Sequence, residues 1–264
     1  LHEQPFTEQA SIAWTLLSVC SYISDCGLVW GDLKPGNFVR FKARNGISHV
    51  FKAIDFDSVC QTNRAKAMHP QHASLLSNVP ETYSPGSRAL VTPGYISPER
   101  ANAILHRESI AADSKQDVFV LGAVLYKLYT GRDLVDSEML GSDQHLHLLA
   151  DPDYEADLSI VHESNVKQLL SEMLQRDPAA RKTFRQLLNH SMWSGQSSVR
   201  ASRILDGMQT RIDTATERLL AGMDKKLVDL KQRLKGSHKT MNVVFASLSH
   251  LRTDAIPMYL LLVP

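Results

Sequence analysis

Length, composition and charge restrict the class of protein before any motif is considered. The chain has 264 residues, 43% of them apolar and 22% charged, which is typical of a folded cytosolic protein. A formal net charge of +1 argues against the electrostatic footprint that nucleic acid or an anionic membrane surface requires, so we expect no nucleic-acid partner. Three cysteines, Cys20, Cys26 and Cys60, form no CxxC pair, which favours reduced thiols and a cytoplasmic location.

The two ends indicate that the sequence is an excerpt of a longer protein. Leu1 is the first residue, and no signal peptide follows it. Residues 258–264 are strongly apolar but far too short to span a bilayer, so we expect no membrane span. We interpret residues 253–264 as the start of a truncated further element.

A helix is the first predicted element. Between residues 7 and 25 the apolar side chains recur with a helical period, and Thr7 suits the N-cap position. Gly27 follows the last turn and suits a left-handed C-cap, because glycine adopts positive φ without a steric penalty.

A β-hairpin and a long loop are predicted next. The runs at residues 38–41 and 49–54 are β-like, and Asn45-Gly46 between them is a strong hairpin signal. Residues 57–91 show little periodicity and contain several Ser and Pro, so we expect one extended loop.

The next part of the chain is predicted to be helical. Residues 118–128 are apolar nearly all round, which indicates a fully buried helix. Two amphipathic helices are expected at residues 164–175 and 181–193.

A polar linker at residues 194–198 precedes a predicted helical tail. Residues 199–252 contain no proline and carry apolar side chains with a 3–4 rhythm, which is typical of a coiled-coil seam that needs a partner helix. Gly236 weakens the helix, and we expect a break or bend there. We favour self-association or a partner helix; the alternatives are packing on the preceding domain or a hairpin bent near Gly236.

The stretch from Gly31 to Asn37, Gly-Asp-Leu-Lys-Pro-Gly-Asn, carries the chemistry. It resembles the catalytic loop H-R-D-L-x-x-x-N of protein kinases, with Asp32 and Asn37 in register. The resemblance implies that Asp32 accepts or orients the substrate hydroxyl proton and that Asn37 holds a metal ion beside it. Lys34 is similar to the lysine of the Ser/Thr branch, which faces the transferring phosphate.

Four further positions follow in the order of the same family. Asp55 lies in Ile54-Asp-Phe-Asp57, placed like the D-F-G motif, so the resemblance implies that it chelates Mg²⁺ at the phosphates of ATP. Glu99 closes a motif similar to A-P-E, and Arg181 lies where its partner arginine belongs. Asp117 matches the residue that braces the catalytic loop. Glu99, Asp117 and Arg181 are therefore expected to be structural.

The sequence departs from the family in three ways. The excerpt contains no N-lobe, so we expect it to bind ATP weakly and to be inactive alone. The H-R-D motif is Trp30-Gly31-Asp32, which removes the arginine that receives a phosphorylated activation loop and replaces the histidine that helps to position Phe56. Asp57 stands where the family has a flexible glycine, and it adds a carboxylate near the metal site.

These observations predict a mainly α fold: a protein-kinase-like C-terminal lobe with a small β-hairpin over residues 1–193, followed by the coiled-coil-like tail. We expect the parent protein to be a Ser/Thr protein kinase that uses ATP and Mg²⁺ and acts on a protein substrate. The alternative is a catalytically impaired pseudokinase that serves as a scaffold through its lobe and tail. The four polar residues of the loop and metal motif favour the enzyme.

Overall fold

The computed structural model describes residues 5–42, 49–63, 65, 79–84, 92–136, 140 and 143–193. The predicted linker at residues 194–198, the helical tail at 199–252 and the last element at 253–264 all lie outside the described residues. The Asn45-Gly46 turn lies outside them as well.

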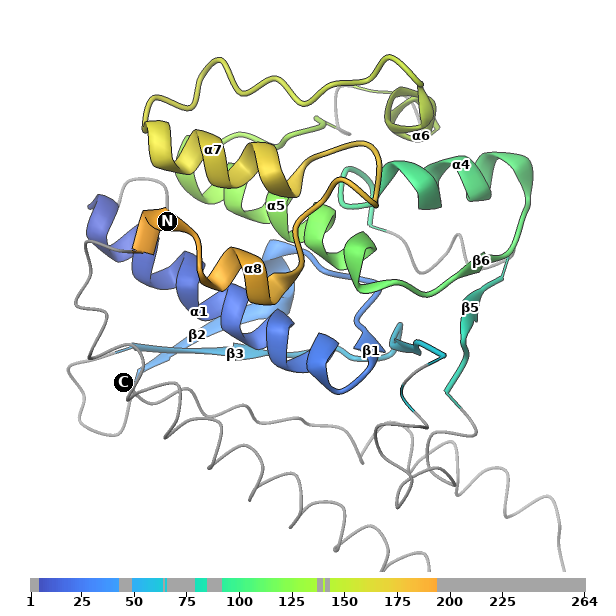
Figure 1. Ribbon diagram of the computed structural model, residues 1–264, viewed down its shortest axis with the longest axis horizontal. Coiled ribbons are helices and arrows are strands. Elements are labelled where there is room, and N and C mark those ends of the chain that lie inside the picture. The colour runs from blue at the N-terminus through green and yellow to red at the C-terminus, as the bar shows by residue number, and fades with distance from the viewer. Residues whose placement is uncertain are drawn as a thin grey trace, which may run out of the picture.

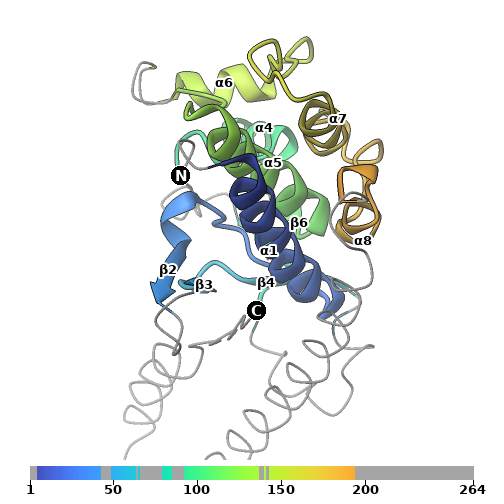
Figure 2. The ribbon, with the colours of Figure 1, turned by 90° about the vertical axis from the view of Figure 1, so that its left-hand side faces the viewer.

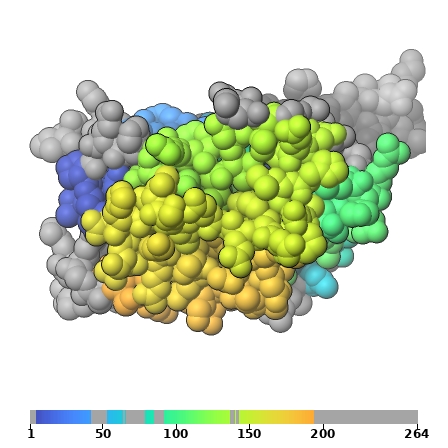
Figure 3. Space-filling view, turned by 90° about the horizontal axis from the view of Figure 1, so that it is seen from above, coloured from blue at the N-terminus to red at the C-terminus, as the bar shows by residue number. Residues whose placement is uncertain are grey.

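Helices make up most of the regular secondary structure in the described part of the chain, which agrees with the predicted fold class. They are α1 (Phe6–Asp25), α4 (Pro98–His106), α5 (Ser114–Thr130), α6 (Gln144–Ala150), α7 (Ser164–Met173) and α8 (Phe184–Leu188). Helix α5 runs between α1 and α7, α8 packs on α1, and α4 packs against α6 (Figure 1). The part of the chain from α6 through α8 spreads across the face seen in Figure 3. Within the described part of the chain, no helix is both long and apolar enough to cross a membrane.

Helix α5 is the centre of the core. Residues 116–126 and Leu128 are all buried, so the helix is enclosed on nearly every side, as its apolar sequence predicts. Its first turn is capped by Asp113, whose side chain accepts a hydrogen bond from the Lys115 backbone N–H at 2.8 Å. Gly131 ends the helix with φ of 74°. This rigid helix therefore fixes the position of its own N-terminal turn.

Three small antiparallel pairs of strands flank the helices. The predicted hairpin is β2 (Phe38–Lys42) with β3 (His49–Ala53), in a register that pairs Phe38 with Ala53. The other pairs are β1 (Leu28–Val29) with β4 (Cys60–Gln61), and β5 (Thr82–Tyr83) with β6 (Ile110–Ala111). In Figure 2 the β2–β3 hairpin lies on one side of α1, and α7 and α8 lie on the other.

The first helix confirms the predicted element but not its cap. It begins at Phe6, and Pro5 occupies the N-cap with no side-chain capping bond, so the prediction of Thr7 was wrong. Pro5 fits directly before the helix because it has no backbone N–H to satisfy there and its φ of −54° is fixed by the ring. The glycine prediction is correct: Gly27 has φ of 73°, and an added Cβ would lie 2.7 Å from Ala65 Cα.

Two other predictions need correction. The segment 57–91 is not one extended loop, because β4 and β5 lie within it; strands of two residues are too short to produce a periodic pattern. The helix expected at 181–193 spans only Phe184–Leu188 and is followed by a 3-10 turn, Ser191–Trp193. Thr183 sets its start through a capping box with Gln186.

Gly122 permits the close approach of α5 to the end of α7, and this generates a stability prediction. A Cβ at residue 122 would lie 2.8 Å from Leu174 Cδ2 and 3.1 Å from Met173 Cβ. Overpacking costs about 1–3 kcal/mol, which exceeds the helix-propensity gain of about 1 kcal/mol, so Gly122→Ala should lower the free energy of unfolding. Urea unfolding measures it, with Gly36→Ala as control, since nothing lies within 4 Å of a Cβ there. An unchanged or raised free energy of unfolding in Gly122→Ala would contradict this account of the packing.

Candidate active site

The buried carboxylate of Asp117 holds the start of the catalytic loop. Asp117 lies in the first turn of α5, is 5% exposed, and accepts backbone hydrogen bonds from Trp30 at 2.6 Å and Gly31 at 3.1 Å. Burial raises the pKa of this carboxyl to about 6, while the two N–H donors and the Arg100 charge act in the opposite direction. The bracing position expected for Asp117 is thus occupied, 86 residues along the chain from Gly31.

The side chains of Asp32, Lys34 and Thr92 contact one another and form a polar triangle. Its Oδ2 is 2.6 Å from Lys34 Nζ, and its Oδ1 accepts a hydrogen bond of 2.8 Å from Thr92 Oγ1. Lys34 Nζ also donates to Thr92 Oγ1 at 3.2 Å. Lys34 and Asp32 therefore face one another. Thr92, which begins the segment that leads to Glu99, contacts both of them.

The buried side chain of Asn37 contacts the backbone of the catalytic loop. It ends the 3-10 turn Pro35–Asn37, is 3% exposed, and donates from Nδ2 to the backbone carbonyl of Asp32 at 2.8 Å. Because the amide nitrogen is used in this bond, the amide oxygen remains available as a ligand.

Asp55 has an uncommon backbone conformation next to Asn37. Its φ is 64°, a left-handed value that is uncommon outside glycine. The backbone on either side is tied down: Ile54 N donates to Asn37 O at 2.9 Å, and Trp30 Nε1 donates to Asp55 O at 2.7 Å. Hydrogen bonds on both sides thus hold the backbone at Asp55 beside the Asn37 carbonyl, and the side chain of Asp55 is exposed.

Trp30 takes the place of the family's histidine and performs two contacts there. Besides its bond to Asp55 O, its ring stacks on Phe56 with centroids 4.8 Å apart and planes at 19°. It meets Phe38 edge-on at 5.3 Å. An indole can therefore hold the Asp55–Phe56 segment through a hydrogen bond and an aromatic stack together.

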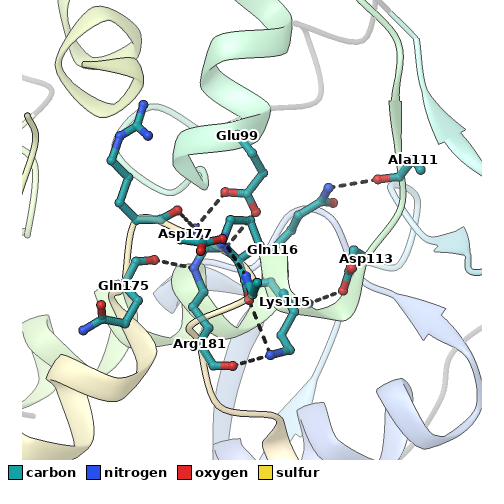
Figure 4. Close-up of polar contacts among 11 residues, drawn as sticks. Glu99, Ala111, Asp113, Lys115, Gln116, Gln175, Asp177 and Arg181 are labelled. Atoms are coloured by element: carbon teal, nitrogen blue, oxygen red, sulfur yellow. Dashed lines mark hydrogen bonds and ion pairs between the residues drawn. The ribbon is translucent and has the colours of Figure 1, made fainter. Parts of the chain in front are cut away.

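Arg181 and Glu99 form the ion pair that the resemblance implies, and Figure 4 shows them pointing toward each other. The two Arg181–Glu99 bonds are 2.7 and 2.8 Å long, and Arg181 is 2% exposed. The guanidinium also donates to the carbonyls of Gln175, Lys115 and Arg176 at 2.5, 3.0 and 2.8 Å. Because all its donors are used, the buried cation links α4, α5 and the turn after α7.

The donor set fits a magnesium ion. Mg²⁺ takes oxygen ligands, commonly one or two side chains together with substrate phosphates and water. Asn37 offers an amide oxygen and Asp55 an exposed carboxylate. Among the described residues no cluster of three or more His, Cys, Asp or Glu could hold a metal ion.

Two residues of this site were missed from the sequence. Thr92 touches both Asp32 and Lys34; its place at the start of Thr92-Pro-Gly-Tyr was the available signal. Arg100 donates from Nη1 to the Gly31 carbonyl and is 5% exposed. Its position directly after Glu99 gives no indication of that contact.

Comparison with known proteins agrees with this geometry. The family model described as a protein kinase domain matches residues 2–193 of the chain. The chain belongs to the eukaryotic-type Ser/Thr protein kinase family. It is 26% identical to a Dictyostelium discoideum protein named "Probable serine/threonine-protein kinase fhkD", over 83% of this chain and 27% of that one. It is 27% identical to "Dual specificity protein kinase TTK" of Mus musculus, over 69% and 19%. It is 28% identical to "MAP kinase-interacting serine/threonine-protein kinase mnk-1" of Caenorhabditis elegans, over 78% and 30%.

The chain spans less than a third of the length of each of these curated relatives.

The titration of Asp117 predicts a specific pH dependence of stability. Its folded pKa of about 6 lies above the ordinary value of 3.8, so the carboxyl favours folding below about pH 4 and this contribution is lost as pH rises through 6. The free energy of unfolding of the wild type, minus that of Asp117→Asn, should therefore fall across this interval, by at most roughly 3 kcal/mol. Urea unfolding of both proteins between pH 3.5 and about 7 measures the difference. A difference that rises with pH would show that the carboxylate is stabilised in the fold.

Proposed function

We propose that the protein from which this sequence comes is a Ser/Thr protein kinase, which transfers the γ-phosphoryl group of ATP to a Ser or Thr hydroxyl of a protein substrate. The observation that carries the proposal is the triangle of Asp32, Lys34 and Thr92, with contacts of 2.6, 2.8 and 3.2 Å. It combines a carboxylate, a cation and a hydroxyl at one point, on a loop braced from below by Asp117.

Asp32 serves as the group that accepts or orients the substrate hydroxyl proton. Its carboxylate is held on one oxygen by Lys34 and on the other by Thr92, so its direction is determined before a substrate arrives. Preorganisation of this kind reduces the cost of aligning the hydroxyl with the phosphoryl group.

Lys34 stabilises negative charge beside the reacting atoms. Its ammonium group is only part-buried, and its 2.6 Å contact with Asp32 keeps it next to the base. A point charge that is fixed in advance stabilises the developing charge on the phosphoryl oxygens more in the transition state than in the ground state.

Asn37 and Asp55 are proposed to hold Mg²⁺, which would supply positive charge against the negative charge that develops during transfer. Asn37 connects this role to the base, because the same amide group bonds the backbone carbonyl of Asp32 at 2.8 Å. Displacement of the Asn37 side chain would therefore affect both metal binding and the position of Asp32.

The departures from the family leave the polar groups that favour an enzyme in place. Trp30 keeps the Asp55 carbonyl bonded and Phe56 packed, so loss of the histidine leaves this segment held. Asp57 is exposed, and the contacts among Asp32, Lys34 and Thr92 are made in its presence.

The protein substrate is proposed from the family alone. The coiled-coil contact of residues 199–252 stays a proposal that rests on the apolar rhythm of their sequence.

The test of this function is Asp32→Asn in the full-length protein. An amide cannot accept the proton, so phosphoryl transfer should fall by a factor between about 100 and 10,000 with an unchanged melting curve. Transfer of radiolabelled phosphate from ATP to a generic protein substrate measures the rate. The matched control is Asp25→Asn, since Asp25 is a surface carboxylate whose contact is Arg185 at 3.4 Å. Equal activity of both variants would contradict the assignment of Asp32 as the base.

A further inference from the structure

The space beside Gly31 is occupied by another part of the chain. Gly31 has φ of 81°, and a Cβ on it would lie 2.5 Å from Tyr83 Oη and 2.6 Å from the Ser58 carbonyl. Contacts this short are prohibitive, and the positive φ adds strain for any side chain. Residue 31 therefore cannot carry an arginine while Tyr83 lies where it does.

Arg100 supplies a guanidinium to the same place from a different element. It extends from α4, is 5% exposed, and donates from Nη1 to the Gly31 carbonyl. Its Cζ lies 3.9 Å from the centroid of the Tyr83 ring, within the range of a cation–π contact. Tyr83 thus fills the space beside Gly31, and its ring packs against the Arg100 guanidinium that donates a hydrogen bond to Gly31.

Arg100 and Asp117 hold two successive peptide groups. Asp117 accepts from the N–H of Gly31, which belongs to the peptide before that residue. Arg100 donates to the carbonyl of Gly31, which belongs to the peptide leading directly into Asp32. With both peptides held, the backbone at Asp32 has little freedom to rotate, even though glycine precedes it.

Tyr83 in turn is anchored in the strand β5. The pair Tyr83–Ile110 aligns β5 with β6, and Ala112 N donates to Glu81 O at 2.9 Å. Gln61 N donates to Pro80 O at 2.8 Å, which joins the same segment to β4. The ring is therefore a fixed support for Arg100, and its position depends on the contacts of β5 and Pro80 with β6 and β4.

The charge of Arg100 is unusual for a purely structural side chain. It is buried near Asp117, whose pKa it lowers against the larger effect of burial. Within the described ranges, its Nε and Nη2 have no hydrogen-bond partner. Burial of a guanidinium with two nitrogens unsatisfied costs folding free energy, so the contact with the Gly31 carbonyl calls for an explanation beyond packing.

We propose that Arg100, supported by the ring of Tyr83, is a positioning residue for Asp32. It fixes the carbonyl of Gly31, and it makes the order of the catalytic loop depend on the docking of β5 rather than on a side chain at residue 31. The kinetic part of this proposal rests on the proposed kinase function, whereas the part that concerns loop order does not.

The experiment uses the full-length protein with four single variants, one double variant and one control. Arg100→Met keeps the length of the side chain without a donor, and Arg100→Lys keeps a donor. Tyr83→Phe keeps the ring, and Tyr83→Leu removes it. The control is Arg176→Met, because Arg176 also donates to backbone carbonyls, those of Asp151 and Ala150, at 2.9 and 3.0 Å. Each protein is measured for kcat, KM for ATP, melting temperature and amide hydrogen exchange.

Arg100→Met should lower kcat by roughly 10- to 100-fold with KM for ATP changed less than about twofold, because misplacement of the base affects the chemical step. The amides of residues 31–33 should exchange faster, while those of 118–128 in α5 keep the wild-type rate. Arg100→Lys should recover part of kcat, Tyr83→Phe should match the wild type, and Tyr83→Leu should lie between wild type and Arg100→Met. In the double variant Arg100→Met/Tyr83→Leu, the loss should be close to that of Arg100→Met alone, because the two residues act as one unit.

Several results would overturn the proposal. One is wild-type kcat and loop exchange in Arg100→Met; another is an equal loss in Arg176→Met. Faster exchange in α5 as well as in the loop would show that Arg100 only supports the fold. If Arg100→Met does not fold, Arg100→Lys and Tyr83→Leu decide in its place. A wild-type protein without transferase activity contradicts the proposed function, and the exchange of residues 31–33 then decides whether Arg100 orders the loop.

Discussion

A carboxylate buried inside the helical core is the constraint on which the site depends. Asp117 is placed by α5, the helix enclosed on nearly all sides, and its two oxygens hold the backbone of Trp30 and Gly31. Removing a charge from water is costly, which is why the pKa of Asp117 rises even with two N–H donors on it. The two backbone hydrogen bonds and the charge of Arg100 offset part of this cost, and the enclosed helix α5 fixes the start of the loop that carries Asp32.

Arg181 is a further buried charge, next to the same first turn of α5 that carries Asp117. Arg181 uses a bidentate contact to Glu99 and three backbone carbonyls, so its donors are satisfied where they are buried. It ties α4 to α5, and α4 also carries Arg100 toward Gly31. The loop is therefore held from α5 by Asp117 and from α4 by Arg100, and Arg181 keeps those two helices in register.

Motif spacing singled out the residues whose proposed roles depend on order along the chain: Asp32, Asn37, Asp55, Glu99, Asp117 and Arg181. Their elements were also predictable where a long apolar period exists, as in α1 and α5. The remainder depends on contacts between distant segments. Nothing near Arg100 in the sequence indicates a bond to Gly31, 69 residues away, and a strand as short as β5 has no periodicity to detect. The helix cap at Pro5 and the helix α6 were missed for a similar reason, since short local signals compete with tertiary packing.

The occupied space beside Gly31 also restricts how this sequence can change over time. Any substitution at residue 31 meets Tyr83 and Ser58 first, so it is harmful while Tyr83 is present, whatever the new side chain offers chemically. A smaller residue at 83 would remove only one of these contacts, because the Ser58 carbonyl and the positive φ of residue 31 remain, and it would also remove the support of Arg100. Two neighbours and the backbone conformation thus restrict residue 31 together, and replacement of Tyr83 alone does not make room for an arginine there. A single-site mutational scan would therefore score Gly31 as intolerant because of its neighbours and its backbone conformation, although glycine supplies no side-chain chemistry there.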